Sequence, residues 1–149
     1  MFRIRKSFKV PVGHRLMKHS GLCKNIHGHN LKIEVQLSCH GLDNNDMVMD
    51  FGRLSDYFSS LIVILDHSIL LNSEDTKTIS FSETCSDPGK KVITFENSDP
   101  TAEVLACYIY NQLISWIRAN EKYINLDYVA VWESDDAVAI FDGCEKDVK

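Results

Sequence analysis

The sequence contains few of the residues that interrupt regular structure. It has three prolines and seven glycines in 149 residues, and no internal repeat, low-complexity run or linker-like segment. A chain of this length buries enough surface for one hydrophobic core without cross-links. We therefore expect residues 1–149 to form a single domain.

Several locations and partners are disfavoured by what the sequence lacks. No apolar run approaches the roughly 18 residues of a membrane span, and residues 1–14 lack the apolar segment and cleavage site of a secretory signal. The formal net charge is −5, and no block of Lys and Arg is present, which disfavours nucleic acid as a partner. We expect a soluble, cytoplasmic protein that binds neither membranes nor nucleic acid.

The cysteines do not form a pattern of paired half-cystines. Their number is odd and their spacing is irregular, which argues against a disulfide framework and for reduced thiols in the cytoplasm. The five are Cys23, Cys39, Cys85, Cys107 and Cys144.

Alternating apolar and polar residues predict strands at both ends of the chain. Residues 2–12 and 29–39 each alternate over most of their length, and 123–134 with 137–143 predict a C-terminal hairpin. Residues 77–84 and 90–97 flank Asp87-Pro88-Gly89, which predicts a further hairpin closed by that turn. The sequence indicates no role for this stretch beyond forming a hairpin.

Two segments have the apolar spacing of amphipathic helices. Residues 50–65 begin with Asp50 as the expected N-cap, and residues 99–120 begin with Asp99 as N-cap and Pro100 at the first helical position. Strands, a helix, a hairpin, a second helix and two more strands in this order indicate an α+β domain with an antiparallel sheet.

Two histidines two positions apart suggest a metal site. On a strand, His27 and His29 project from the same face, and His14, at the end of the preceding strand, is the best-placed third ligand. A catalytic zinc commonly has three protein ligands and an open position. The alternatives are a turn with two exposed histidines, or a closed structural site in which Cys23 is a fourth ligand rather than a free acid/base thiol.

Two further positions combine acidic groups with an unusual context. Asp66 and His67 follow the first predicted helix, where a carboxylate can orient an imidazole, although an exposed helix-end pair has the same sequence. Glu133 follows the apolar run 128–132, and a buried acid there needs a partner, which could be a ligand, a base or a backbone amide.

Six motifs in order resemble the family of 6-pyruvoyl- and 6-carboxy-tetrahydropterin synthases. They are HRL at 14–16, CKNIHGH at 23–29, MVMDF at 47–51, LDHSILLN at 65–72, PTAEVLA at 100–106 and VAVWES at 129–134. The set spans the chain from the first predicted strand to the last. The three residues between Cys23 and HGH resemble the 6-carboxy branch of queuosine biosynthesis.

The resemblance implies a role for each candidate residue. It implies that His14, His27 and His29 bind Zn²⁺, that Cys23 is the proton-accepting thiolate, and that Asp66 and His67 form a proton relay. It also implies that Glu133 binds the pterin ring and completes the relay, and that Thr101 and Glu103 lie close to the pterin.

The fold implied is the tunnelling fold, or T-fold, with a four-stranded antiparallel sheet and two helices on one face, to which the sequence adds a hairpin. The implied assembly is a homohexamer, a dimer of trimers with active sites between subunits. The implied activity is that of a carbon–carbon lyase that converts 7,8-dihydroneopterin triphosphate to 6-carboxy-5,6,7,8-tetrahydropterin, acetaldehyde and triphosphate. The alternatives are a 6-pyruvoyl-tetrahydropterin synthase and a non-catalytic zinc-binding module.

The sequence departs from the family pattern at three places. VPVG at 10–13 replaces the usual aromatic-Ser-Ala segment, Asn30 replaces an aromatic residue after HGH, and Val104 replaces an Asn after PTAE. The stretch 77–97 is longer than the usual linker.

Overall fold

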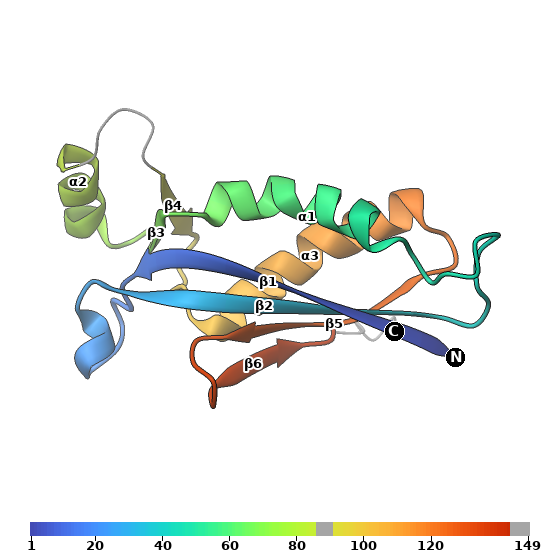
Figure 1. Ribbon diagram of the computed structural model, residues 1–149. Helices are drawn as coiled ribbons and strands as arrows, with labels where there is room; N and C mark the ends of the chain where they lie inside the picture. Colours follow the sequence, from blue (N-terminus) through green and yellow to red (C-terminus); the bar gives the residue numbers. More distant parts are fainter. Residues whose placement is uncertain (86–90, 144–149) are drawn as a thin grey trace, which may run out of the picture.

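The computed structural model describes residues 1–85 and 91–143 (Figure 1). Strands and α-helices follow one another along this part of the chain, and one 3₁₀ turn, η1, lies between the first two strands. In chain order the elements are β1 (Phe2–His14), η1 (Leu22–Lys24), β2 (His27–Cys39), α1 (Phe51–Leu65), β3 (Ser68–Asn72), α2 (Thr76–Thr84), β4 (Val92–Phe95), α3 (Ala102–Asn120), β5 (Asn125–Trp132) and β6 (Val138–Phe141).

The strands of the described chain form one mixed sheet in the order β4-β3-β1-β2-β5-β6. β1 and β2 pair antiparallel over 13 residues, from Phe2 opposite Cys39 to His14 opposite His27. β3 lies parallel to both β1 and β4, whereas β5 and β6 form the predicted antiparallel C-terminal hairpin. Within this sheet, β3 pairs with only the last three residues of β1, Val12 to His14.

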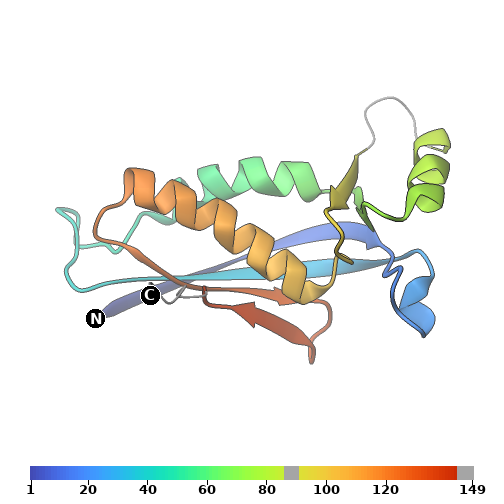
Figure 2. The same cartoon turned by 180° about the vertical axis from the view of Figure 1, so that it is seen from behind.

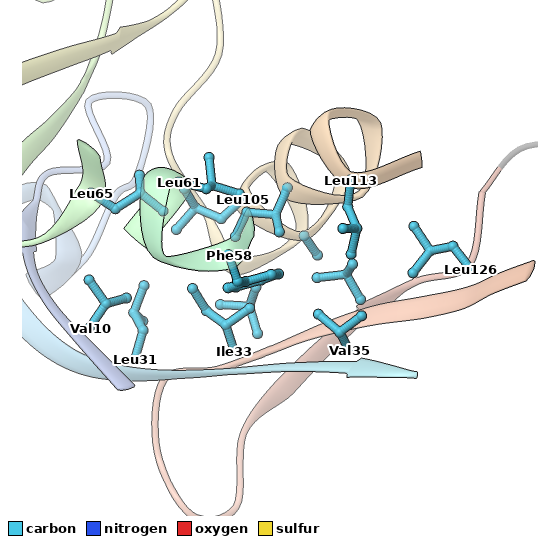
Figure 3. Packing of buried hydrophobic residues seen from close by; sticks show 14 of the residues in the cluster. Val10, Leu31, Ile33, Val35, Phe58, Leu61, Leu65, Leu105, Leu113 and Leu126 are labelled. Atoms are coloured by element: carbon cyan, nitrogen blue, oxygen red, sulfur yellow. The ribbon is translucent and has the colours of Figure 1, made fainter. Parts of the chain in front are cut away.

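Helices α1 and α3 cover one face of the sheet, and the hydrophobic core lies between the two layers (Figures 1 and 2). Phe58 of α1 is fully buried and stacks on Phe8 of β1, with ring centroids 4.1 Å apart. Figure 3 shows Phe58 between the sheet residues Leu31, Ile33 and Val35 and the α3 residues Leu105 and Leu113. The apolar residues that recur at every second position of β2 pack in this core against those that recur at helical spacing in α1 and α3.

The other face of the sheet carries polar side chains that interact across strands. Glu34 accepts a hydrogen bond from the Tyr128 hydroxyl at 2.9 Å and lies 3.8 Å from Arg5. Asp127 accepts hydrogen bonds from Gln36 and Ser38 at 2.8 and 2.5 Å. The alternation in β1 and β2 therefore separates an apolar face from a charged one.

The predicted four-stranded antiparallel sheet with two helices is corrected to a six-stranded mixed sheet with three α-helices within the described residues. Residues 77–84 are helical, so the predicted hairpin is wrong, and its turn, Asp87-Pro88-Gly89, lies outside the described residues. β4 is a strand, but it pairs with β3. The alternation of Ile79 and Phe81 was misleading because this segment does not pack on the core, and Phe81 is 60% exposed.

The expected starts of the two long helices had different outcomes. Asp50 is the N-cap of α1, and its carboxylate accepts a hydrogen bond from the Arg53 amide at 3.0 Å, as predicted. The N-cap of α3 is Thr101 and not Asp99, so Pro100 precedes the helix. The side chain of Asp99 instead accepts hydrogen bonds from two other groups, which are described below.

No helix in the described part of the chain combines the length and the apolar composition needed to cross a membrane.

Candidate metal centre

Three imidazoles converge where the end of β1 meets the start of β2. His14 faces His27 across the ladder, and His29 lies opposite Val12 and two residues along β2 from His27. The ring centroids are 4.4 to 5.1 Å apart, and one nitrogen of each ring lies within 4.8 Å of the other two. His14 is 1% exposed, whereas His27 and His29 are half-buried. The predicted triad is therefore brought together by strand register.

Two of the rings are oriented by backbone carbonyl groups. Nδ1 of His14 lies 2.9 Å from the carbonyl oxygen of Pro100, and Nδ1 of His27 lies 2.8 Å from that of Asn25. A carbonyl oxygen can only accept, so each Nδ1 carries the proton and donates it. When both rings are uncharged, their Nε2 atoms are both acceptors, and these atoms face each other at 3.0 Å.

Two acceptors at this distance repel unless a cation lies between them. The proton-free nitrogens of three imidazoles are a suitable ligand set for zinc, and a carbonyl group that accepts from the other ring nitrogen commonly fixes the tautomer of a metal-binding histidine. The arrangement therefore fits a metal ion held by three histidines. Within the described residues the group has three members, and a zinc ion with three protein ligands commonly takes water or substrate as a fourth ligand.

The environment of His14 favours its neutral, ligating form. Burial is the largest influence and lowers the pKa of His14. The hydrogen bond to Pro100 and the charge of Glu133 raise this pKa, and the neighbouring His27 and His29 lower it again, with a net decrease. A lowered pKa reduces the competition between protons and a metal ion.

Asp99 holds the backbone that orients His14. Its carboxylate accepts one hydrogen bond from the Lys18 amide at 2.7 Å and another from the Asn72 side chain at 2.9 Å. Asp99 is 9% exposed and immediately precedes Pro100, so these bonds fix the position of the Pro100 carbonyl. The sequence suggested only a helix cap here, and an aspartate just before PTAE gives no signal for this long-range role.

Gly28 lies between the two β2 histidines, opposite Gly13 of β1. A Cβ atom at Gly28 would lie 3.0 Å from the carbonyl oxygen of Val12. The backbone of β1 therefore approaches Gly28 closely, which is a common reason for a glycine within a strand.

Cys23 lies in η1, half-buried and with a free thiol. Among the described residues, the group of mutually close ligand atoms contains the three histidines and does not contain Cys23. The conformation therefore does not support Cys23 as a fourth ligand. A neighbouring free thiol is the alternative that remains.

Glu133 directly follows β5, and its amide donates to the carbonyl oxygen of Ala137 at 3.1 Å. Its side chain is half-buried rather than buried, which corrects the expectation from the apolar run before it. The carboxylate contributes to the electrostatic environment of His14, so it belongs to the same region of the molecule.

Asp66 and His67 are paired but are not part of the histidine group. Nδ1 of His67 lies 3.0 Å from a carboxylate oxygen of Asp66, and the two side chains are 79% and 44% exposed. His67 has a φ of 55°, and its amide donates to the Pro11 carbonyl at 2.9 Å. A left-handed backbone at a non-glycine residue is uncommon. Within one chain, this pair has the exposed helix-end arrangement.

Thr101 and Glu103 lie at the start of α3. The Thr101 hydroxyl accepts a hydrogen bond from the Val104 amide at 3.3 Å, so this side chain caps the helix. Glu103 is exposed in the first turn. Thr101 follows Pro100 directly, so the capped turn begins immediately after the residue that orients His14.

Two bacterial relatives of the chain share one name. The chain is 30% identical over 124 residues to the 6-carboxy-5,6,7,8-tetrahydropterin synthase of Rickettsia felis, which covers 83% of this chain and 88% of that protein. It is 29% identical over 127 residues to the protein of that name from Aquifex aeolicus, covering 75% and 78%.

Solved structures share the fold. An uncharacterized protein from Wolinella succinogenes superposes with a TM-score of 0.77 at 20% identity, over 95% of this chain and 97% of that one. The 6-pyruvoyl tetrahydropterin synthase of Caenorhabditis elegans superposes with a TM-score of 0.68 at 21% identity, over 96% of each chain. The sequence model described as 6-pyruvoyl tetrahydropterin synthase matches residues 3–144. The chain therefore belongs to the 6-pyruvoyl tetrahydropterin synthase family.

Proposed function

We propose that this protein is a zinc-dependent 6-carboxy-5,6,7,8-tetrahydropterin synthase. It would convert 7,8-dihydroneopterin triphosphate to 6-carboxy-tetrahydropterin, acetaldehyde and triphosphate, as a carbon–carbon lyase of queuosine biosynthesis. The observation that carries the proposal is the group of three histidines, two of them oriented by carbonyl oxygens. The names of the curated relatives support the 6-carboxy branch.

His14, His27 and His29 would hold the zinc ion, each through a nitrogen that faces the centre of the group. A bound zinc supplies Lewis acidity, which polarises oxygen atoms of a substrate and makes an adjacent C–H more acidic. The burial of His14 and its lowered pKa support this role, since a protonated imidazole cannot bind a metal.

The remaining candidates would move protons and bind the pterin. Cys23 would accept a proton from the substrate as a thiolate, and His67, oriented by Asp66, would return one. Glu133 would accept two N–H bonds from the pterin ring, which gives orientation as well as affinity. Thr101 and Glu103 would lie at the edge of the pterin pocket, close to the Pro100 carbonyl.

A homo-oligomer would bring these groups together. His67 is exposed and lies outside the histidine group of its own chain, so a site formed between subunits would give it a partner. Within the described sheet, residues 2–10 of β1 have one unpaired edge, and β6 is an outer strand. Unpaired edges are available for strand pairing between copies. We propose a hexamer of two trimers on this basis.

The compartment proposed is the cytoplasm. The described cysteines, Cys23, Cys39, Cys85 and Cys107, are all free thiols. Thiols that remain reduced are typical of that compartment.

Two alternatives make different predictions. A 6-pyruvoyl-tetrahydropterin synthase would act on the same substrate by triphosphate elimination, and the fold shared with the nematode enzyme keeps this reading open to test. A non-catalytic zinc module would use Cys23 as a fourth ligand, and the separation of Cys23 from the histidine group argues against it.

The products distinguish these functions. Zinc-loaded protein is incubated with 7,8-dihydroneopterin triphosphate, and the pterin and any acetaldehyde are identified by mass spectrometry. The proposal predicts 6-carboxy-tetrahydropterin together with acetaldehyde. A 6-pyruvoyl product without acetaldehyde would assign the other branch, and no turnover by zinc-loaded protein would favour the binding module.

A further inference from the structure

Arg15 connects the turn that carries Cys23 to helix α2. Its Nε donates to the carbonyl oxygen of Lys24 at 2.7 Å, and its Nη1 donates to the carboxylate of Asp75 and to the Thr78 hydroxyl, the latter at 2.9 Å. The side chains of Arg15 and Asp75 are 20% and 6% exposed. One guanidinium group therefore joins two segments that are far apart in the sequence.

The backbone around Cys23 has few other restraints. In η1 no side chain is fully buried, and Leu22 is 85% exposed. The turn is held by hydrogen bonds of its carbonyl groups: Leu22 accepts from the Asn25 amide, Cys23 from the Leu16 amide, and Lys24 from Arg15. Hydrophobic packing contributes little here, so polar contacts hold the backbone of the turn that carries Cys23.

Helix α2 is likewise anchored by polar groups. Ser82 is its only buried residue, and no large apolar side chain of the helix is buried. Asp75, at the N-cap position, is the buried residue that faces Arg15. Burial alone would raise the pKa of Asp75, but hydrogen bonds from Thr78 and Arg15, with the charge of Arg15, outweigh it and lower that pKa.

The two segments lie at the same end of the molecule. In Figures 1 and 2, α2 and the turn with η1 both extend beyond the end of the sheet where β1 meets β3. His14, which immediately precedes Arg15, is at this end. The candidate metal ligand His14 and Arg15, which restrains the Cys23 turn, are therefore consecutive residues.

We propose that Arg15, held by Asp75, is a positioning residue that fixes the Cys23 turn relative to the histidine centre. Helix α2 would then have a role in the site without contacting the substrate, because it supplies the buried carboxylate that holds the guanidinium group. An ion pair with low exposure and three geometric restraints orients a side chain more strongly than an exposed pair does. We call the contacts of Arg15 with Asp75, Thr78 and Lys24 the clamp. Its importance for turnover rests on the proposed role of Cys23.

The test compares Asp75→Asn with Asp75→Glu in zinc-loaded, full-length protein. We expect Asp75→Asn to speed hydrogen exchange in peptides covering residues 15–26 by about threefold or more. We expect it to lower kcat by roughly tenfold, because a small misplacement of a reacting group is costly. KM and the zinc content should change little, and Asp75→Glu, which keeps the charge, should restore part of kcat.

Glu121→Gln is the matched control. Glu121 pairs with Arg53 at 2.7 Å where α1 begins and α3 ends, at the opposite end of the helices from η1. This variant also removes a carboxylate from an arginine, and it should leave both exchange at residues 15–26 and kcat unchanged. If Glu121→Gln caused the same local exchange, the effect would be general destabilisation and the inference would be wrong.

Two measurements separate failure of the clamp from failure of the proposed function. Unchanged exchange at residues 15–26 in Asp75→Asn would overturn the clamp whatever the activity is. Faster exchange with normal kcat would overturn its catalytic relevance. Normal turnover by Cys23→Ala would instead refute the proposed role of Cys23, and the exchange result would still report on the clamp.

Discussion

His14 and His27 face each other across the last pair of the β1–β2 ladder, with their Nε2 atoms 3.0 Å apart. Each ring donates through Nδ1 to a backbone carbonyl from a different segment, Pro100 for one and Asn25 for the other. The metal-binding geometry is therefore determined by two loops as well as by the strand register.

Replacing a histidine of the group should abolish metal binding. Loss of a group that only hydrogen-bonds to a ligand typically weakens metal affinity by about 10- to 100-fold, so His27→Ala, which removes a ligand itself, should weaken zinc binding by more than about 100-fold. Zinc should also raise the thermal midpoint of the wild type, because it binds the folded chain. His40→Ala, at an exposed position outside the group, is the control. Zinc bound equally by both variants would refute the site.

Removing the thiol should separate catalysis from metal binding. We expect Cys23→Ala to retain zinc and to lose turnover, because the thiol lies outside the histidine group. Zinc content by atomic emission and product formation are measured on the same preparation. Loss of zinc from this variant would support the fourth-ligand alternative, and retained activity would show that the thiolate is not the base.

Gly28 should not tolerate a side chain. The Cβ of Gly28→Ala would lie 3.0 Å from the Val12 carbonyl oxygen, and relief requires β1 to move away from β2 beside His14 and His29. We expect destabilisation of about 1–3 kcal/mol and weaker zinc binding. At Gly41 an added Cβ meets nothing within 4 Å, so Gly41→Ala should change the free energy of unfolding by less than about 0.5 kcal/mol. Equal effects in denaturant titrations would contradict the steric argument.

Metal-free protein should lose stability as the pH falls below the ordinary histidine pKa of 6.5. The pKa of His14 is lower in the folded state, so the unfolded chain binds a proton first, and unfolding becomes easier with each step down in pH. The contribution is fully present above pH 6.5 and is lost as the pH falls through the folded pKa. One such group adds at most about 1.4 kcal/mol for each pH unit.

This slope is measured by denaturant titrations in the presence of a chelator. The slope of unfolding free energy against pH between 5 and 7 should be smaller in His14→Asn than in the wild type. Identical slopes would mean that His14 titrates in the folded chain as it does in the unfolded chain.

Sites formed between subunits should allow complementation. Cys23→Ala and His67→Ala should each be inactive alone. Co-unfolded and co-refolded, or co-expressed, they should regain part of the wild-type activity, because some sites would combine an intact Cys23 with an intact His67 from another copy. A mixture as inactive as either variant would indicate that both residues serve the same chain.

The predictions from local pattern succeeded where one segment contained the information. The alternation in β2 predicted its buried face, and Asp50 caps α1 as its position before an apolar helical run suggested. The prediction from local pattern was wrong for residues 77–84, which are helical. Their helix is anchored by Asp75 and Arg15, which are 60 residues apart, and no pattern within nine residues signals a partner at that distance.

By itself, the sequence determined the metal-site hypothesis, because two histidines separated by one glycine on a strand must share a face, and His14 ends the strand that pairs with it. Only the tertiary structure decided how the rings are oriented, that Cys23 lies outside the histidine group, and that β3 joins the sheet in parallel. The physical reason is that these features depend on contacts between distant segments, such as Pro100 with His14 and Asp75 with Arg15, which no local periodicity encodes.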